Sequence, residues 1–110
     1  AFSHVWVFFW LHENDDSDSR SVLRVHPRKN PKNPLTGVFF TRSPMRPNLL
    51  GQSLCEIKDV NPEAGWIRVS GLDARDGTPL LDIKPYLPRS DAAENLRLPA
   101  WAGNVKKIDP

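Results

Sequence analysis

The sequence has few of the residues that build redox or metal sites. It contains a single cysteine, Cys55, so no disulfide can form within the chain. Its three histidines, His4, His12 and His26, lack zinc-binding spacing and cysteine partners. These absences exclude a disulfide framework, argue against a metal site, and favour a reducing compartment, by default the cytoplasm.

Long hydrophobic runs are also missing. The longest one, Val5 to Leu11, has seven residues, whereas a membrane-spanning helix needs about 20. It has no positively charged flank and no small-residue cleavage site, so it is not a signal peptide. We therefore expect neither a membrane span nor a leader in this sequence.

Glycine is scarce and scattered, with six residues in the chain. No GxGxxG or GxxxxGKS pattern occurs, which excludes a readable Rossmann cofactor site or P-loop. No serine stands in a nucleophile elbow, so a hydrolase remains only a minor alternative.

The 110 residues, 39% of them hydrophobic, predict one small domain with a single core over 1–110. No segment has a helical apolar stripe longer than about two turns, and short strands alternate with turn signals. We expect strands at 2–11, 22–25, 37–41 and 80–83, a hairpin of 54–60 with 66–69, and one helical turn within 92–96. The 2–11 strand is apolar on both faces, which predicts burial on both sides. The pattern favours an all-β fold with long loops, either a barrel or a sandwich.

Acidic residues are absent between Ser19 and Cys55, a third of the chain. The same stretch holds seven basic residues, Arg20, Arg24, Arg28, Lys29, Lys32, Arg42 and Arg46. Such a block is the electrostatic footprint expected for a polyanion. The alternative is a solvated loop of ordinary surface charge.

Two of these arginines lie in the segment GVFFTRSPMRPNLLGQS, residues 37–53. Pro44 and Pro47 each fix φ and restrict the residue before them, so a helix is excluded here. Arg42 and Arg46 are then held on a stiffened turn, where a planar guanidinium suits a carboxylate or a phosphate. A solvated, proline-rich surface loop is the alternative.

Three segments together resemble one family. TRSPMRPNLLGQS resembles the RSPxRPNPIG signature of the TsaA family, the TrmO (YaeB-like) tRNA methyltransferases. FSHVWVFFWLHE at 2–13 is similar to the family's FSHxWVxFxFH block, and GLDARDGTPLLDIKPYLP at 71–88 to its LDLxDGTPVxDIKPYxP block. All three occur in the family's order. Leu49 and Gln52 depart from the signature, where proline and an apolar residue are usual.

The resemblance implies a β-barrel-like domain, usually a homodimer. It also implies methyl transfer from S-adenosylmethionine to the exocyclic nitrogen of threonylcarbamoyl-adenosine beside the tRNA anticodon. Family members carry a further N-terminal segment with strands and a Pro-x-Gln cofactor motif, which these 110 residues lack. We therefore expect the chain to be a fragment or a truncated homologue whose N-terminal strands are missing.

By position in the motifs, the resemblance implies two sets of site residues. The expected cofactor contacts are His12, Glu13, Arg42, Leu54, Leu72, Asp73, Ala74 and Arg75. The expected substrate contacts are Arg46, Asn48, Lys84 and Tyr86. Structural roles compete with several of these: His12 as a strand cap, Leu54 as core, and Lys84 with Tyr86 in packing of strand ends.

No catalytic base is assigned, although Asp73, Asp76 and Asp82 are candidates to accept the proton lost from the acceptor nitrogen. Two other functions remain open: a basic RNA-binding module without catalysis, and a barrel methyltransferase with a small-molecule acceptor.

Overall fold

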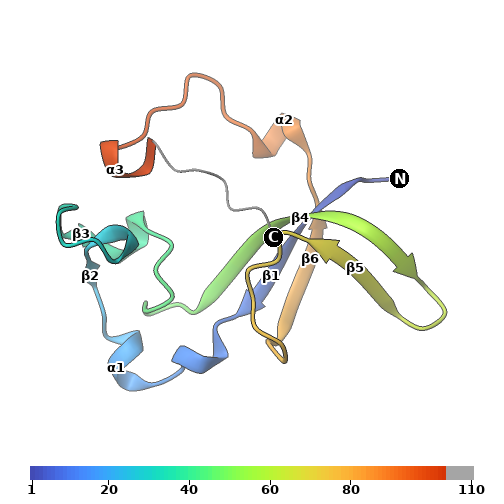
Figure 1. Ribbon diagram of the computed structural model, residues 1–110, viewed down its shortest axis with the longest axis horizontal. Coiled ribbons are helices and arrows are strands. Elements are labelled where there is room, and N and C mark those ends of the chain that lie inside the picture. The colour runs from blue at the N-terminus through green and yellow to red at the C-terminus, as the bar shows by residue number, and fades with distance from the viewer. Residues whose placement is uncertain (104–110) are drawn as a thin grey trace.

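The computed structural model describes residues 1–103 of the chain. Its main sheet has four strands, β1 (His4–Trp10), β4 (Leu50–Asn61), β5 (Trp66–Ser70) and β6 (Leu80–Pro85), in the order β5-β4-β1-β6 (Figure 1). All neighbouring strands in this sheet run antiparallel. A second, two-stranded sheet pairs β2 (Arg24–Val25) with β3 (Thr36–Gly37).

In the described part of the chain, helical structure is limited to single turns. These are η1 (His12–Asn14), α1 (Ser17–Arg20), η2 (Pro27–Lys29), η3 (Val38–Phe40), α2 (Pro88–Asp91) and α3 (Ala100–Gly103). The prediction of a β-rich chain with long loops is therefore confirmed. The main sheet is open within residues 1–103, with β5 and β6 at its edges, and no barrel closes there. No helix in that range is both long and apolar enough to cross a membrane.

The core lies on one face of the main sheet. Val5, Val7 and Phe9 alternate along β1 and are buried, and they pack with the buried Cys55 of β4. On the opposite face, Trp6, Phe8 and Trp10 are only partly buried. The prediction that this strand is buried on both sides is therefore confirmed for the core face, whereas the other face is only partly buried.

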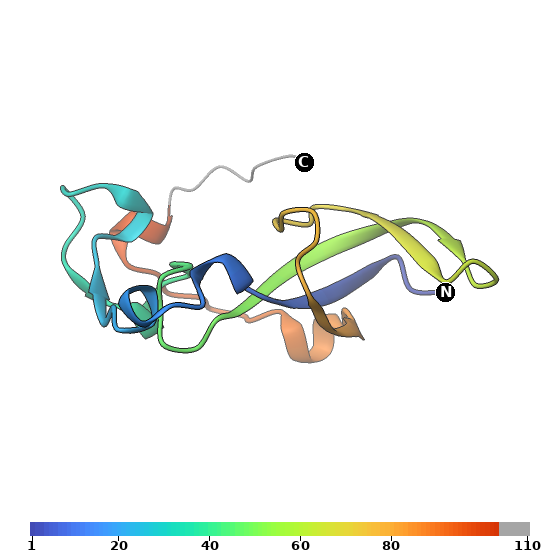
Figure 2. The same cartoon turned by 90° about the horizontal axis from the view of Figure 1, so that it is seen from below.

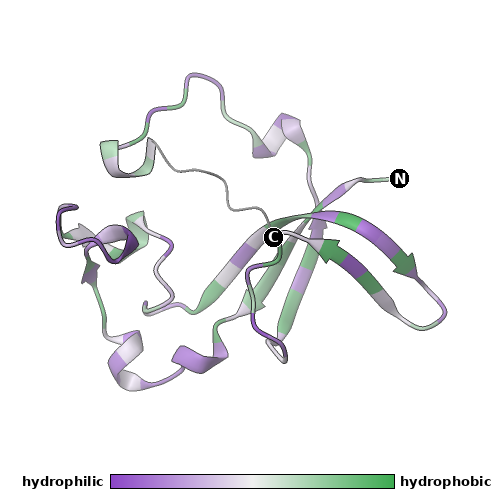
Figure 3. Cartoon of the chain, viewed as in Figure 1, coloured by the Kyte–Doolittle hydropathy of each residue, from purple (hydrophilic) through white to green (hydrophobic). Residues whose placement is uncertain are grey.

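The predicted hairpin is present as β4 and β5. Its turn covers residues 61–65, where Gly65 has φ of 78° and the Gly65 amide donates to the carbonyl oxygen of Asn61 at 2.8 Å. The hairpin forms one end of the molecule beside the N-terminus, and β2, β3 and α3 lie at the other end (Figure 2). Hydrophobic and hydrophilic residues alternate along its strands, as expected for a sheet with one face on the core (Figure 3).

The predicted strand at 37–41 is wrong. β3 ends at Gly37, and residues Val38–Phe40 form a 3-10 turn. The Val38 amide still donates to the carbonyl oxygen of Leu23 at 2.9 Å, which continues the β2–β3 pairing by one residue, and the Val38 side chain is buried. The strand ends there because a local turn closes on Val38. The Thr41 amide and hydroxyl then both donate to the carbonyl oxygen of Val38. The apolar run turns instead of continuing, and Phe40 is left 83% exposed.

The helical turn expected within 92–96 is also wrong, because the turn lies earlier, at α2. Pro88 is the first residue of α2, a position where its fixed φ suits a helix and its missing N–H costs nothing. The Asp91 carboxylate accepts a hydrogen bond from the Leu87 amide at 2.9 Å and closes the turn. Asn95 then has φ of 54°, outside the right-handed helical region.

Candidate functional site

The predicted site residues surround a cavity of about 1150 Å³ at the end of β1. We call it the motif cavity. Its walls come from η1, the loop 41–49 (the arginine loop), the first half of β4 and the loop 71–78. All eight expected cofactor contacts line it, together with Arg46 and Asn48, whereas Lys84 and Tyr86 do not. The structure thus brings ten of the twelve predicted residues together.

The arginine loop is tied down at several points. Leu49 is fully buried, and its carbonyl oxygen accepts a hydrogen bond from the Leu11 amide at 2.8 Å. The side chain of Asn14 donates to the carbonyl oxygen of Pro44, and Arg20 Nε donates to that of Pro47, both at 3.1 Å. These bonds attach the loop to η1 and α1 and give the cavity a fixed wall.

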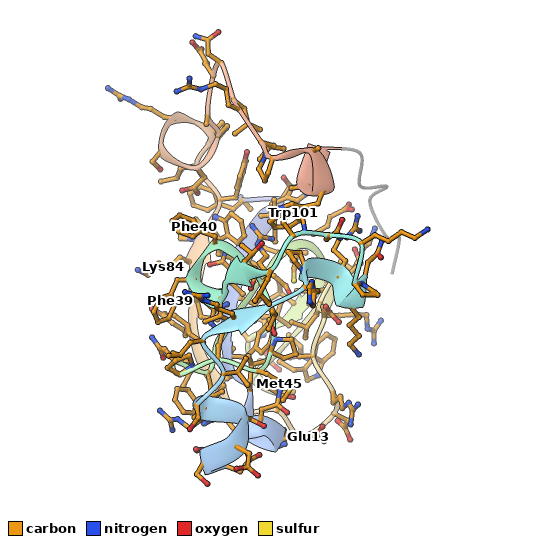
Figure 4. The ribbon with its side chains drawn as sticks, turned by 90° about the vertical axis from the view of Figure 1, so that its left-hand side faces the viewer. Glu13, Phe39, Phe40, Met45, Lys84 and Trp101 are labelled. Carbon is orange, nitrogen blue, oxygen red and sulfur yellow. The ribbon has the colours of Figure 1, made fainter. Side chains whose placement is uncertain are left out.

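The two arginines of the loop have different surroundings. Arg46 Nη1 donates to the carbonyl oxygen of Thr41 at 2.8 Å, and its guanidinium lies 5.8 Å from the centroid of the Phe39 ring. Arg42 is exposed and makes no hydrogen bond or ion pair with the described residues. Arg46 therefore shapes the loop, and Arg42 presents a free cation at the cavity. Figure 4, which shows the left-hand side of Figure 1, labels Phe39 and Phe40 of η3 and Met45 of the arginine loop.

An ion pair joins the two sides of the cavity. Arg75 Nη1 lies 2.6 Å from Glu13 Oε2, so the loop 71–78 is linked to η1. Both side chains are more than half exposed, and such pairs add little to stability. The loop is fixed more firmly where the Asp73 amide donates to the buried Ser53 hydroxyl at 3.1 Å. The pair therefore orients two charged groups at the cavity mouth.

The apolar candidates contribute to the wall in different ways. Leu54 and Leu72 are 38% and 42% exposed, so neither is a core residue. Ala74 lines the cavity and is partly buried against the core cluster. His12 is exposed at the start of η1.

Sequence reasoning missed Arg20 as a support of the site. Its guanidinium lies 5.6 Å from the Trp10 ring centroid, and its Nη1 is 2.9 Å from Asp15 Oδ1. The hydrogen bond from Arg20, with a second from Trp10 Nε1, lowers the pKa of Asp15 below its ordinary value of 3.8. The position of Arg20 directly after an acidic cluster was a sequence signal for its ion pair. No local pattern indicated that Arg20 would also contact Pro47.

Lys84 and Tyr86 lie on the sheet face opposite the core. Lys84 Nζ is 5.8 Å from the centroid of the Phe8 ring. The Tyr86 ring centroid is 6.2 Å from that of Trp6, with the planes inclined at 53°. Of the three aspartates considered as proton acceptors, only Asp73 lines the motif cavity.

Metal ligands do not gather in this region. Within residues 1–103, no group of three or more His, Cys, Asp or Glu side chains is placed to hold a metal ion. The charged groups around the cavity instead pair with one another or stand free, as Arg42 does.

Comparison with known proteins gives a consistent result. Residues 1–92 match the family model described as the tRNA-methyltransferase O N-terminal domain. A mouse protein named tRNA (adenine(37)-N6)-methyltransferase is 45% identical over 95 residues, which cover 86% of this chain and 21% of that protein. A probable S-adenosyl-L-methionine-binding protein of Methanothermobacter thermautotrophicus is 49% identical over 92 residues, covering 83% of this chain and 60% of that protein.

Solved structures agree with this relationship. The crystal structure of TrmO from Pseudomonas aeruginosa matches with a TM-score of 0.62 and 38% sequence identity, over 87% of this chain and 36% of that one. The chain thus spans about a fifth of its mammalian relative and about a third of the bacterial structure.

Proposed function

This chain belongs to the family of the tRNA-methyltransferase O N-terminal domain, and from that premise we propose that it methylates tRNA. The proposed reaction transfers a methyl group from S-adenosylmethionine to N6 of the adenosine beside the anticodon, the position in the mouse relative's name. We also propose that the acceptor adenosine is modified, as threonylcarbamoyl-adenosine. The observation that carries it is the gathering of the three motif segments around one cavity.

The residues around the motif cavity fit the cofactor. S-adenosylmethionine has a carboxylate, two cationic centres and an adenine ring, and it supplies an electrophilic methyl group when bound. Arg42 is a free guanidinium suited to the carboxylate. Asp73 and the Glu13 oxygen that does not pair with Arg75 offer anionic oxygens for the cations. Leu54 and Leu72 expose apolar surface for the adenine. At about 1150 Å³, the cavity is also large enough for such a ligand.

The chain's own contribution is mainly positioning. A sulfonium is a good leaving group, so the protein has to align the two reactants and exclude water rather than form a covalent intermediate. The bonds from Asn14 and Arg20 to the arginine loop keep the cavity wall in place for this purpose. Of the three aspartates considered as proton acceptors, Asp73 alone lines the cavity, and no residue is assigned as the catalytic base.

An RNA substrate is supported by the distribution of charge. The basic block between Ser19 and Cys55 contributes the β2–β3 segment and the arginine loop, and the arginine loop borders the motif cavity. Arg24, Arg28 and Lys32 on this segment are exposed. Phosphate contacts from such side chains predict RNA binding that weakens steeply as salt rises.

Further features complete the proposal. We infer that 1–110 act as one TsaA-like domain, that β5 and β6 are the edges at which a barrel closes, and that the protein is a homodimer. Large apolar side chains exposed on the β4–β5 hairpin, Val60, Trp66 and Ile67, support a further packing partner. A tRNA substrate also implies the cytoplasm as its location.

The direct test is methyl transfer from tritium-labelled S-adenosylmethionine to tRNA, with an RNA carrying guanosine at the acceptor position as the control. Incorporation that requires the acceptor adenosine supports the proposal. RNA binding without cofactor binding or transfer would favour the non-catalytic RNA-binding module. Transfer to a small molecule but not to RNA would favour the barrel methyltransferase with a small-molecule acceptor.

A further inference from the structure

A second cavity lies on the sheet face opposite the core. It holds about 500 Å³ between the β1, β4 and β6 side chains and the turn into α2. We call it the α2 groove. Trp6 and Phe8 of β1 form its aromatic wall, and Gln52 and Lys84 are their neighbours across the sheet, since Phe8 pairs with Gln52 and Trp6 with Lys84.

The aromatic wall is held in a fixed orientation. Trp6 Nε1 donates to Asp91 Oδ2 at 3.0 Å, and the same carboxylate accepts from the Leu87 amide at 2.9 Å. The Tyr86 ring also packs near the indole, and the two ring centroids are 6.2 Å apart. The acidic residue in the groove is therefore occupied with structural hydrogen bonds, and the ring faces are preorganised.

Two polar groups in the groove remain free. Lys84 makes no ion pair with the described residues; its ammonium lies over the Phe8 ring, 5.8 Å from the centroid, a cation–π contact that a base stacking on Phe8 would displace. The Gln52 amide is exposed and makes no side-chain hydrogen bond within residues 1–103, so both its donor and its acceptor are available. Aromatic faces, an amide and a cation are together the complement of one unstacked nucleotide.

The groove adjoins the motif cavity, because Trp6 and Gln52 line both. We propose that the α2 groove binds the acceptor purine nucleotide, unstacked from its RNA loop. The base stacks on Trp6 and Phe8, Gln52 hydrogen-bonds its edge, and Lys84 contacts a phosphate. This inference rests on the proposed function, and it places the acceptor where the two cavities meet.

A single nucleotide fits the dimensions. About 500 Å³ is within the usual range for small-ligand pockets and is too small for a helical segment of RNA. Enzymes that modify a base commonly take it out of the stack and read it between aromatic side chains. An RNA loop supplies such a base at low cost, because it is already unpaired.

Photo-crosslinking tests the placement without requiring catalysis. An anticodon stem-loop RNA with azidoadenine at the acceptor position is bound to the chain, irradiated, and mapped by mass spectrometry. Crosslinks to Trp6, Phe8 or Lys84 are expected. Crosslinks confined to the arginine loop or the β2–β3 segment would overturn the inference.

Affinity gives the second readout. Phe8→Leu keeps an apolar side chain of similar volume but removes the ring, and we expect it to weaken RNA binding about tenfold with cofactor affinity unchanged. Lys84→Gln should weaken RNA binding several-fold and lower its salt dependence. Phe40→Leu and Lys58→Gln, an aromatic residue and a lysine outside both cavities, are the matched controls. Equal effects of Phe8→Leu and Phe40→Leu in folded proteins would reject the groove.

The two proposals fail in different ways. Methyl transfer to RNA together with crosslinks elsewhere would reject the groove and keep the function. Crosslinks in the groove without any cofactor binding or transfer would keep the groove as an RNA site and reject the function.

Discussion

Arg20 donates a hydrogen bond from Nε to the carbonyl oxygen of Pro47, 3.1 Å away, and joins α1 to the arginine loop across 27 residues of sequence. The same guanidinium pairs with Asp15 and covers the Trp10 ring. Because one side chain connects a strand end, a helical turn and the cavity wall, its removal should loosen the site without removing a ligand contact.

Arg20→Ala is therefore expected to weaken S-adenosylmethionine binding about threefold to tenfold, since misplacement of a positioning element costs affinity. Its effect on stability should stay below about 1 kcal/mol, because the ion pair is exposed. Calorimetric titration measures the first and chemical denaturation the second. Arg24→Ala, an exposed arginine of β2, is the control. Equal affinities in Arg20→Ala and the wild type would contradict this role.

Gly51 is expected to be intolerant of any side chain. A Cβ at this position would overlap the ring of Phe9, which is buried in the core. Gly51→Ala should lower the free energy of unfolding by about 1–3 kcal/mol, the usual cost of overpacking. At Gly37 an added Cβ meets only an ordinary contact, 3.9 Å from Phe40, so Gly37→Ala is the matched control.

The double variant Gly51→Ala/Phe9→Leu provides the check on this explanation. If the clash with the ring is the cause, the two substitutions together should cost less than the sum of their separate effects. Strict additivity in urea denaturation would show that Gly51 is required for another reason.

Asp91 makes part of the stability dependent on pH. Its hydrogen bond from the Leu87 amide, followed by that from Trp6 Nε1, lowers the pKa of the carboxyl below its ordinary value of 3.8. A lowered folded-state pKa means that the contribution is present above the unfolded pKa and is lost as pH falls through the folded pKa.

The melting temperature of the wild type should therefore exceed that of Asp91→Asn near neutral pH, and the difference should shrink below about pH 4. Thermal melts across this range measure it. Asp18→Asn, at an exposed position, should differ little from the wild type throughout. A gap between wild type and Asp91→Asn that is constant with pH would exclude the proposed linkage.

Cys55 should be chemically inert in the folded protein. The side chain is fully buried, and burial raises the pKa of its thiol. Since the thiolate is the reactive species, a thiol reagent should modify it slowly in buffer and rapidly in denaturant. Fast, stoichiometric modification under native conditions would show that the core around β4 opens readily.

Part of this fold could be predicted from local sequence patterns. The apolar run at 2–11 predicted β1, although not which of its faces forms the core, and the turn around Gly65 predicted the β4–β5 hairpin. Both signals are local, because side chains alternate along a strand and a turn selects glycine where φ is positive.

Contacts between residues far apart in the sequence could not be predicted. The Trp6 indole is held by Asp91, 85 residues away, and Arg20 is held by the carbonyl oxygen of Pro47, 27 residues away. Neither partner leaves a periodic or compositional signal. The site residues came from motif resemblance, and the structure adds that Arg46 is used within the loop whereas Arg42 is free at the cavity.

The central claim is that the motif cavity binds S-adenosylmethionine through Arg42. Calorimetric titration of S-adenosylmethionine into the purified chain, Arg42→Ala and Arg68→Ala tests it most directly, with Arg68 as an arginine of β5 outside the cavity. The account predicts saturable binding by the wild type and Arg68→Ala, and at least about tenfold weaker binding by Arg42→Ala, the effect of losing a charged hydrogen-bond donor. Equal binding by all three proteins, or no binding by a folded wild type, would contradict it.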